Sequence, residues 1–167
     1  MQKDFNIETK EILVKKIIDK VVELSKNEKI IGMYLNTYIT DTPNGLYSYV
    51  LIHAVVNDLL YDDCQDVCEK EIAFTDKIDD IDFFVYGCRY SKYNPYMLCG
   101  VEEKYCWWLS RGTILWDPDE KLITIKKKMN RIRSVADKLK KWKVDKEEDN
   151  ISPEINNRCL QKINLLK

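Results

Sequence analysis

The chain has 167 residues, a length typical of one domain, and a chain of this size can bury a core without disulfides or metal ions. Hydrophobic residues (45%) and charged residues (33%) occur at ordinary levels, while five glycines and four prolines are too few for a disordered chain. The first residues are charged and lack the apolar core of a signal peptide, and no stretch approaches the roughly 18 apolar residues of a membrane span. We therefore expect a cytoplasmic protein that does not enter a membrane.

Charge is distributed unevenly along the chain, although the net charge is only −1. Residues 58–82 contain ten acidic residues and two lysines, whereas residues 121–146 contain eleven basic residues and two aspartates. Solvated helix faces that attract each other are favoured over a specific binding patch. The basic helix expected over residues 126–143 could contact phosphates, but the net charge argues against a general affinity for nucleic acid.

The cysteines and the one histidine do not form a recognisable metal or catalytic motif. Cys64 and Cys68 are one helical turn apart, but no second pair with ligand spacing follows, so no zinc site is expected. His53 falls in the middle of a predicted strand, and the sequence places no serine or cysteine beside it as a nucleophile. We expect reduced thiols and a structural histidine.

In chain order, the first predicted element is an amphipathic helix over residues 8–26, with Thr9 as its cap. A strand rich in β-branched and aromatic residues follows over residues 30–39. The sequence TDTPNG, residues 40–45, predicts a loop, and the nearly apolar stretch 46–56 predicts a strand in the interior of a sheet. The helix should bury one face, formed by Leu13, Ile17, Val21 and Leu24.

The second half of the chain continues the alternation of helices and strands. The acidic segment 59–72 is expected to be a helix with Leu59, Leu60, Cys64 and Val67 facing inward. Residues 81–88 predict a third strand. The further predictions are a helix over 97–109, a short strand over 112–117, a basic helix over 122–142 and a short helix over 153–167.

These elements predict an α+β fold with a mixed β-sheet of about four to five strands flanked by helices. Residues 1–150 would form the domain, and residues 151–167 a short C-terminal helix or tail. In the basic helix, apolar residues recur in steps of three and four, which is typical of a helix packed on a core. These positions are Ile125, Met129, Ile132, Val135, Leu139 and Trp142.

Two stretches and their order resemble the nucleotidyltransferase fold of the polymerase β superfamily, whose small members include minimal nucleotidyltransferases and aminoglycoside adenylyltransferases. The stretches are IIGMYLNTYITDTPNGLYSYVLIHAVVND and RGTILWDPDEKL, and the resemblance spans residues 10–143. It implies two carboxylates at i and i+2 on one strand and a third on a neighbouring strand, which together hold two magnesium ions. It also implies a Gly-Ser turn near the nucleotide phosphates.

Placed on this chain, the resemblance implies a degenerate cleft. The Gly-Ser turn falls on Asn36 and Thr37, and the serine before the acids falls on Ser48. The first acid is replaced by Tyr49 and the second by Leu51, neither of which binds magnesium. The resemblance therefore implies no metal and no cofactor in this cleft.

The third acid of the family falls on Asp82, which stands without its two partners. Asp80 and Asp82 share the i, i+2 spacing of a metal pair, but no Gly-Ser-like turn precedes them by about a dozen residues. An acidic entrance to a strand is the favoured interpretation of this pair.

The leading hypothesis is a nucleotidyltransferase-like pseudoenzyme that acts as a binding or regulatory domain. Its partner would be another protein, a second copy of the chain, or a nucleotide held without magnesium. One alternative is an active nucleotidyltransferase that transfers a nucleotidyl group from a nucleoside triphosphate, with Mg²⁺ held by Asp80 and Asp82. The other alternative is an unrelated α+β interaction protein.

Overall fold

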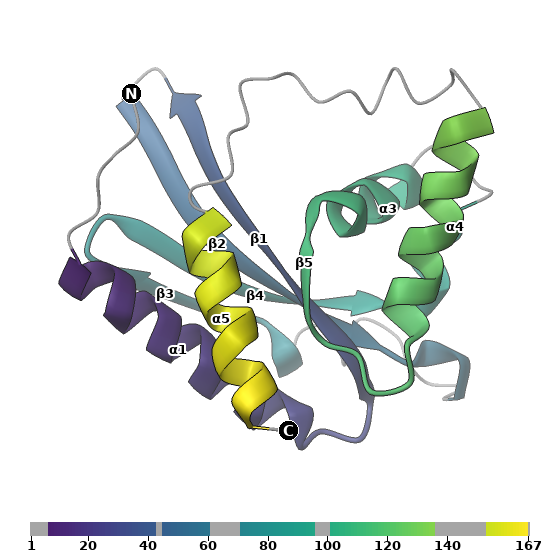
Figure 1. The fold of residues 1–167 in the computed structure, drawn as a ribbon, viewed down its shortest axis with the longest axis horizontal. Coiled ribbons are helices and arrows are strands. Elements are labelled where there is room, and N and C mark those ends of the chain that lie inside the picture. Colours follow the sequence, from purple (N-terminus) through teal and green to yellow (C-terminus); the bar gives the residue numbers. More distant parts are fainter. Residues whose placement is uncertain (1–6, 43–44, 61–70, 96–100, 136–152, 167) are drawn as a thin grey trace.

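The computed structural model describes residues 7–42, 45–60, 71–95, 101–135 and 153–166. Their strands form one sheet, and four helices and two short 3₁₀ segments surround it (Figure 1). The strands are β1 (Ile30–Thr42), β2 (Gly45–Val56), β3 (Phe74–Ile78), β4 (Ile81–Arg89) and β5 (Thr113–Trp116). The helices are α1 (Ile7–Ser25), α3 (Val101–Arg111), α4 (Lys121–Val135) and α5 (Pro153–Leu165), and the 3₁₀ segments are η1 (Asp58–Leu60) and η2 (Tyr90–Lys92).

The five strands form a mixed sheet in the order β3-β4-β2-β1-β5. Strand β2 pairs antiparallel with β1 and parallel with β4, while the two outer strands, β3 and β5, each pair antiparallel with their neighbour. The predicted α+β fold and the interior position of strand 46–56 are both confirmed. An interior strand has neighbours on both edges, and residues 51–56 of β2 are buried on both faces, which explains their nearly continuous apolar sequence.

Helices α1 and α5 lie side by side on one face of the sheet, which we call the closed face (Figure 1). The predicted inward residues of α1 are all buried there, and Ile155, Cys159 and Ile163 of α5 join the same cluster. The predicted C-terminal helix therefore contributes to the core of the sheet domain. The strand residues of this cluster alternate with residues on the other face, as strand geometry requires: Val50, Ile52, Ala54, Ile81, Phe83 and Val85.

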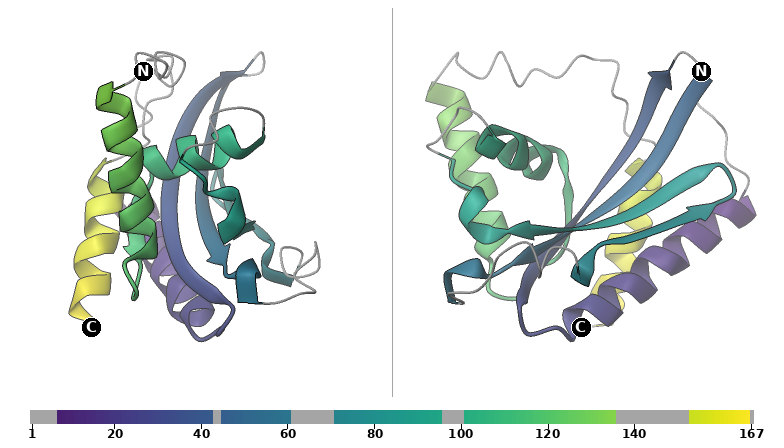
Figure 2. Two further views of the ribbon diagram at one scale, coloured as in Figure 1. Left: turned by 90° about the vertical axis from the view of Figure 1, so that its right-hand side faces the viewer. Right: turned by 180° about the vertical axis from the view of Figure 1, so that it is seen from behind.

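The opposite face of the sheet is covered only in part by described helices. Helices α3 and α4 pack over the end of the sheet that includes β5, and β3 and β4 extend beyond them (Figure 2). The start of α4 is fixed by Asp117, whose carboxylate accepts hydrogen bonds from the backbone N–H groups of Leu122 (3.1 Å) and Ile123 (2.8 Å). Ile125 and Met129 of the predicted helix face are buried here.

The prediction of a loop over residues 40–45 is wrong, because β1 runs to Thr42 and β2 begins at Gly45. The turn that the resemblance implies at Asn36 and Thr37 is also absent from the structure. These two residues lie in the middle of β1, in regular register with Leu51 and Val50. The β-branched and aromatic residues around them favour an extended chain, and this preference outweighs the polar character of the segment.

Two further predictions near the ends of elements are wrong. Thr9 does not cap α1, because the helix already begins at Ile7, and its hydroxyl instead donates to Asp79 Oδ2 at 2.6 Å. Leu59, expected to face inward from a helix, lies in η1 with 68% of its surface exposed. Strand β3 was not predicted from the sequence, and charged residues occupy two of its five positions.

Other predicted elements occur close to their expected positions, and α3 ends at Arg111 instead of at residue 109. Parts of several predictions lie outside the described residues. These parts are the acidic helix over 61–70, the beginning of helix 97–109 and the basic helix beyond residue 135. Cys64, Val67, Leu139 and Trp142 belong to those parts.

Candidate functional site

The part of this face that the described helices α3 and α4 do not cover, which we call the open sheet face, is formed by side chains of β2, β3 and β4. Strand register places Tyr49 beside Asp82 and Leu51 beside Phe84, while Lys77 of β3 also neighbours Asp82. Because alternate residues of a strand share a face, Tyr86 lies on the same side as Asp82 and Phe84. This face therefore combines three aromatic rings with one carboxylate and one ammonium group.

The three aromatic rings of the open sheet face contact one another in a row. The ring centroids of Tyr49 and Phe84 are 6.2 Å apart and their planes meet at 63°, while those of Phe84 and Tyr86 are 5.8 Å apart at 31°. Tyr86 is 43% exposed, and Tyr49 and Phe84 are half-buried. Rings that are packed together and still accessible to solvent can contact a ligand without a rearrangement of the fold.

The charged pair on this face is loosely held. Lys77 Nζ lies 3.9 Å from Asp82 Oδ1, and the side chain of Lys77 is 64% exposed whereas that of Asp82 is 22% exposed. An ion pair of this length at the surface contributes little to stability. The carboxylate is thus available to a competing cation.

Three of the predicted cleft residues come together on the open sheet face. Tyr49 and Leu51 stand at successive outward positions of β2, and Asp82 lies next to Tyr49 on the parallel neighbour β4. The three residues that the resemblance groups together are thus neighbours on two adjacent strands. Of the two β2 positions, one holds an aromatic ring and the other a buried alkyl group.

The other predicted cleft residues are separated from that group. Asn36 is on the same side of the sheet but is buried, and its Nδ2 donates to the carbonyl of Trp108 at 3.1 Å. Thr37 pairs with Val50 and is buried on the closed face, and Ser48, two residues before Val50, is also buried on that face. Neither hydroxyl therefore faces the open sheet face.

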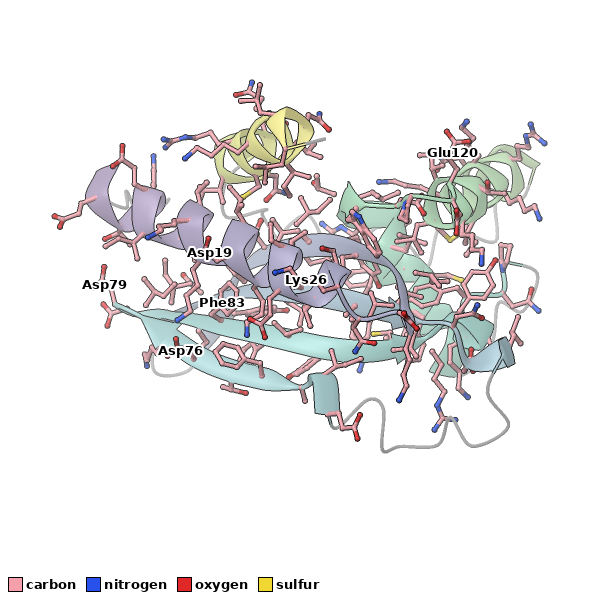
Figure 3. All side chains as sticks on the ribbon, turned by 90° about the horizontal axis from the view of Figure 1, so that it is seen from below. Asp19, Lys26, Asp76, Asp79, Phe83 and Glu120 are labelled. Atoms are coloured by element: carbon pink, nitrogen blue, oxygen red, sulfur yellow. The ribbon has the colours of Figure 1, made fainter. Side chains whose placement is uncertain are left out.

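The carboxylates of the enzyme alternative do not share a strand. Asp82 is the second residue of β4, whereas Asp80 is exposed in the turn between β3 and β4. Asp79, in the same turn, has a φ of 52° and accepts the hydrogen bond from Thr9, and Figure 3 shows it at the end of the turn. Among the described residues, no group of three or more His, Cys, Asp or Glu side chains is arranged to hold a metal ion.

His53 has a thiol neighbour that the sequence did not reveal. Cys88 Sγ lies 3.6 Å from His53 Nδ1, because β2 and β4 are parallel neighbours and both side chains point towards α3. The imidazole stacks on Tyr34 with a centroid distance of 4.3 Å and contacts Trp108 at 5.0 Å. This contact could be found only with the knowledge that residues 46–56 and 81–88 form parallel neighbouring strands.

The surroundings of this pair favour a structural role over a catalytic one. His53 and Cys88 are both buried, and burial lowers the pKa of the imidazole to about 3. Beside them, the hydroxyls of Tyr34 and Tyr93 are 2.8 Å apart, and burial raises the pKa of Tyr93. A neutral histidine without access to solvent cannot readily exchange protons with a substrate.

A groove of about 360 Å³ lies on the closed-face side, between the ends of α1 and α5. Its lining is mostly apolar, and Trp116 of β5 forms part of it. The lining residues are Val21, Val22, Ser25, Trp116, Ile163 and Leu166. None of the predicted cleft residues lines this groove.

The molecule is an α+β domain with a five-stranded mixed sheet. No helix among the described residues is both long enough and apolar enough to cross a bilayer. Searches against models of protein families, against curated proteins and against solved structures each found no match to this chain.

Proposed function

We propose that this protein is a nucleotidyltransferase-like domain without transferase activity, which acts by binding a protein partner through its open sheet face. The observation that carries the proposal is the register of β2 and β4, which sets Tyr49 beside Asp82 and Leu51 beside Phe84. Two magnesium ions need several carboxylate oxygens that converge from neighbouring strands. At the corresponding positions this chain offers one carboxylate, and Lys77 already contacts it.

The accessible rings support the binding part of the proposal. Aromatic side chains are enriched where proteins bind one another, because they bury a large area at a small cost in side-chain entropy. Tyr86 keeps 43% of its surface exposed although its neighbours on β2 and β4 are largely buried. An exposed ring within a packed row of rings is a suitable anchor for a partner.

The relation to nucleotidyltransferases rests on β2 and β4 and not on β1. The β1–β2 hairpin, with Asn36 and Thr37 in mid-strand, departs from the turn that the resemblance implies. Binding through the open sheet face does not depend on that relation, and it applies equally to an unrelated α+β interaction protein.

Isothermal titration with ATP, with and without magnesium, tests the absence of transferase chemistry. We expect no binding that depends on magnesium, because Tyr49 and Leu51 provide no ligand for the ion. Asp82→Asn should leave the titration unchanged, as should the matched variant Asp76→Asn, whose position pairs with Phe83 on the closed face. Magnesium-dependent binding that disappears in Asp82→Asn and persists in Asp76→Asn would establish the enzyme alternative instead.

Aromatic NMR signals of Phe84 and Tyr86 test the binding surface itself. A panel of three short peptides, one basic, one acidic and one uncharged with tyrosines, would be titrated into the full chain. We expect at least one peptide to shift these signals while the signals of Phe83, on the closed face, stay unchanged. If no peptide shifts them, the open sheet face is not a binding surface.

A further inference from the structure

We propose that the open sheet face recognises a cationic side chain, an arginine or a lysine, presented by a partner protein. This inference rests on the proposed binding function and adds the chemistry of the partner. The site would consist of the rings of Tyr49, Phe84 and Tyr86 together with the carboxylate of Asp82.

The rings have a geometry suited to a cation. The faces of aromatic rings carry a partial negative charge and attract an ammonium or guanidinium group within about 6 Å of the centroid. Tyr49 and Phe84 meet edge to face at 63°, and Phe84 and Tyr86 are tilted by 31° to each other along β4, so the row presents rings in different orientations. A planar guanidinium can stack on the face of one such ring while it contacts a neighbouring ring.

The carboxylate lies where the charge of such a ligand would need a counterion. Asp82 pairs with Tyr49 of the parallel strand β2. Along β4, Asp82, Phe84 and Tyr86 occupy successive positions on the same face. Its present contact with Lys77 is 3.9 Å long, and Lys77 is mostly exposed. An incoming arginine could therefore displace Lys77 and form a shorter, two-pronged contact with the carboxylate.

The charge of the surrounding chain favours a cation over an anion. Among the described residues close to Asp82, Asp79 and Asp80 lie in the turn directly before β4, and Lys77 is the one basic residue of β3. An acidic environment attracts basic ligands and repels phosphates over a distance of about one Debye length, about 8 Å at physiological salt. Nucleic acid is therefore the less favoured ligand for the same rings.

The same chemistry already occurs inside this protein. Lys20 Nζ lies 3.9 Å from the ring centroid of Phe74, Lys104 Nζ lies 4.6 Å from that of Trp108, and the guanidinium carbon of Arg111 lies 5.0 Å from that of Trp107. These contacts pair rings with cations of the chain itself. On the open sheet face, the cation would come from the partner.

The test measures the affinity of the full chain for a tetra-arginine peptide by isothermal titration, in parallel with a tetraglutamate peptide and a single-stranded oligonucleotide. We expect the arginine peptide to bind best, with an affinity that falls as salt is added. Asp82→Asn should weaken it about fivefold, and Tyr86→Leu, which removes the ring but keeps an apolar side chain, about threefold. Lys77→Gln should strengthen it about twofold, because it removes the competing cation.

Asp76→Asn is the matched control, because it neutralises an aspartate of the neighbouring strand that is paired with Lys16 on the closed face and is more accessible than Asp82 (40% against 22% exposed). It should change the affinity less than Asp82→Asn. All four substitutions are at exposed or half-buried positions, and thermal unfolding would verify that each variant is folded.

Three outcomes contradict the inference. In the first outcome, tetraglutamate or the oligonucleotide binds best, Lys77→Gln weakens its affinity and Asp82→Asn strengthens it. The face then binds anions, and the proposed binding function stands with a different ligand. If the arginine peptide binds equally to Asp82→Asn and Asp76→Asn, it binds elsewhere. If no ligand in either panel perturbs Phe84 and Tyr86, both this inference and the proposed binding function fail.

Discussion

The two faces of the sheet differ most clearly at two consecutive residues of β4. Phe83 is completely buried on the closed face, in the cluster formed with α1 and α5, and Figure 3 shows it on the side of the sheet that α1 covers. Phe84 points the opposite way and remains half-exposed between Tyr49 and Tyr86. One face thus uses an aromatic ring to hold the fold together, and the other keeps the same type of ring accessible. The sequence places the two residues on opposite faces of the strand but does not say which face a helix covers.

The largest expected effect tests this contrast directly. Phe83→Ala should reduce the free energy of unfolding by about 3–5 kcal/mol, because it leaves a cavity in a closed core. Phe84→Ala should cost only about 1 kcal/mol, since part of the ring is already in water. Urea unfolding of both variants would measure the difference. Equal losses would show that the open sheet face is as important for stability as the closed face.

The second prediction concerns His53, which lies where the partly covered face passes under α3. The folded protein keeps the imidazole neutral down to about pH 3, whereas the unfolded chain takes up a proton below about pH 6.5. Stability is therefore complete above pH 6.5 and falls as the pH decreases towards 3. Between pH 7 and pH 5 the loss from this group should be about 2 kcal/mol.

The variant His53→Gln isolates this contribution, because carboxylates titrate similarly in both proteins. Between pH 7 and pH 5, we expect the free energy of unfolding of His53→Gln, measured with urea, to fall by about 2 kcal/mol less than that of the wild type. The same pH dependence in both proteins would mean that water reaches the imidazole, and that α3 does not close this end of the face.

The smallest expected effect concerns how α1 is attached to the sheet. Thr9 of α1 donates to Asp79 in the β3–β4 turn, close to the start of the open sheet face. Thr9→Val keeps the shape of the side chain and should cost about 1 kcal/mol in the free energy of unfolding. Ser25→Ala is the matched control, because the Ser25 hydroxyl donates to the Val22 carbonyl of the same helix, at 2.7 Å, and does not connect α1 to the sheet through this bond. A smaller loss for Thr9→Val than for Ser25→Ala would contradict the anchoring role.

Much of the fold follows from patterns that are local in the sequence. Steps of three and four placed Leu13, Ile17 and Met129 in the core, and a continuous apolar run placed β2 inside the sheet. Strand β3 escaped prediction because it is a short edge strand in which Thr75, Asp76 and Lys77 follow one another, so that it lacks the alternation of apolar and polar residues that signals a strand. The facing ends of β1 and β2 were predicted too short, because the Pro-Asn-Gly sequence over residues 43–45 favours a loop while Thr40 and Asp41 give no strong signal for a strand.

The candidate site depends on contacts that are not local. The resemblance identified Tyr49, Leu51 and Asp82 as a group, and strand register does bring them together. The contact of His53 with Cys88 and the aromatic row of Tyr49, Phe84 and Tyr86 required the parallel pairing of β2 with β4. Periodicity can assign a residue to one side of its strand, but it does not say which strands are neighbours or which side a helix covers.

The pairing of α1 with α5 has a consequence for how the protein is made. These helices come from opposite ends of the sequence, and Ile155 and Cys159 are completely buried in the same cluster as Leu13 and Ile17. During synthesis on the ribosome, the sheet can be complete once residue 116 has emerged, but its apolar face remains uncovered by α5 until residues 153–165 follow. At about 5–20 residues per second this interval lasts seconds, during which a nascent chain is exposed to aggregation and to chaperones.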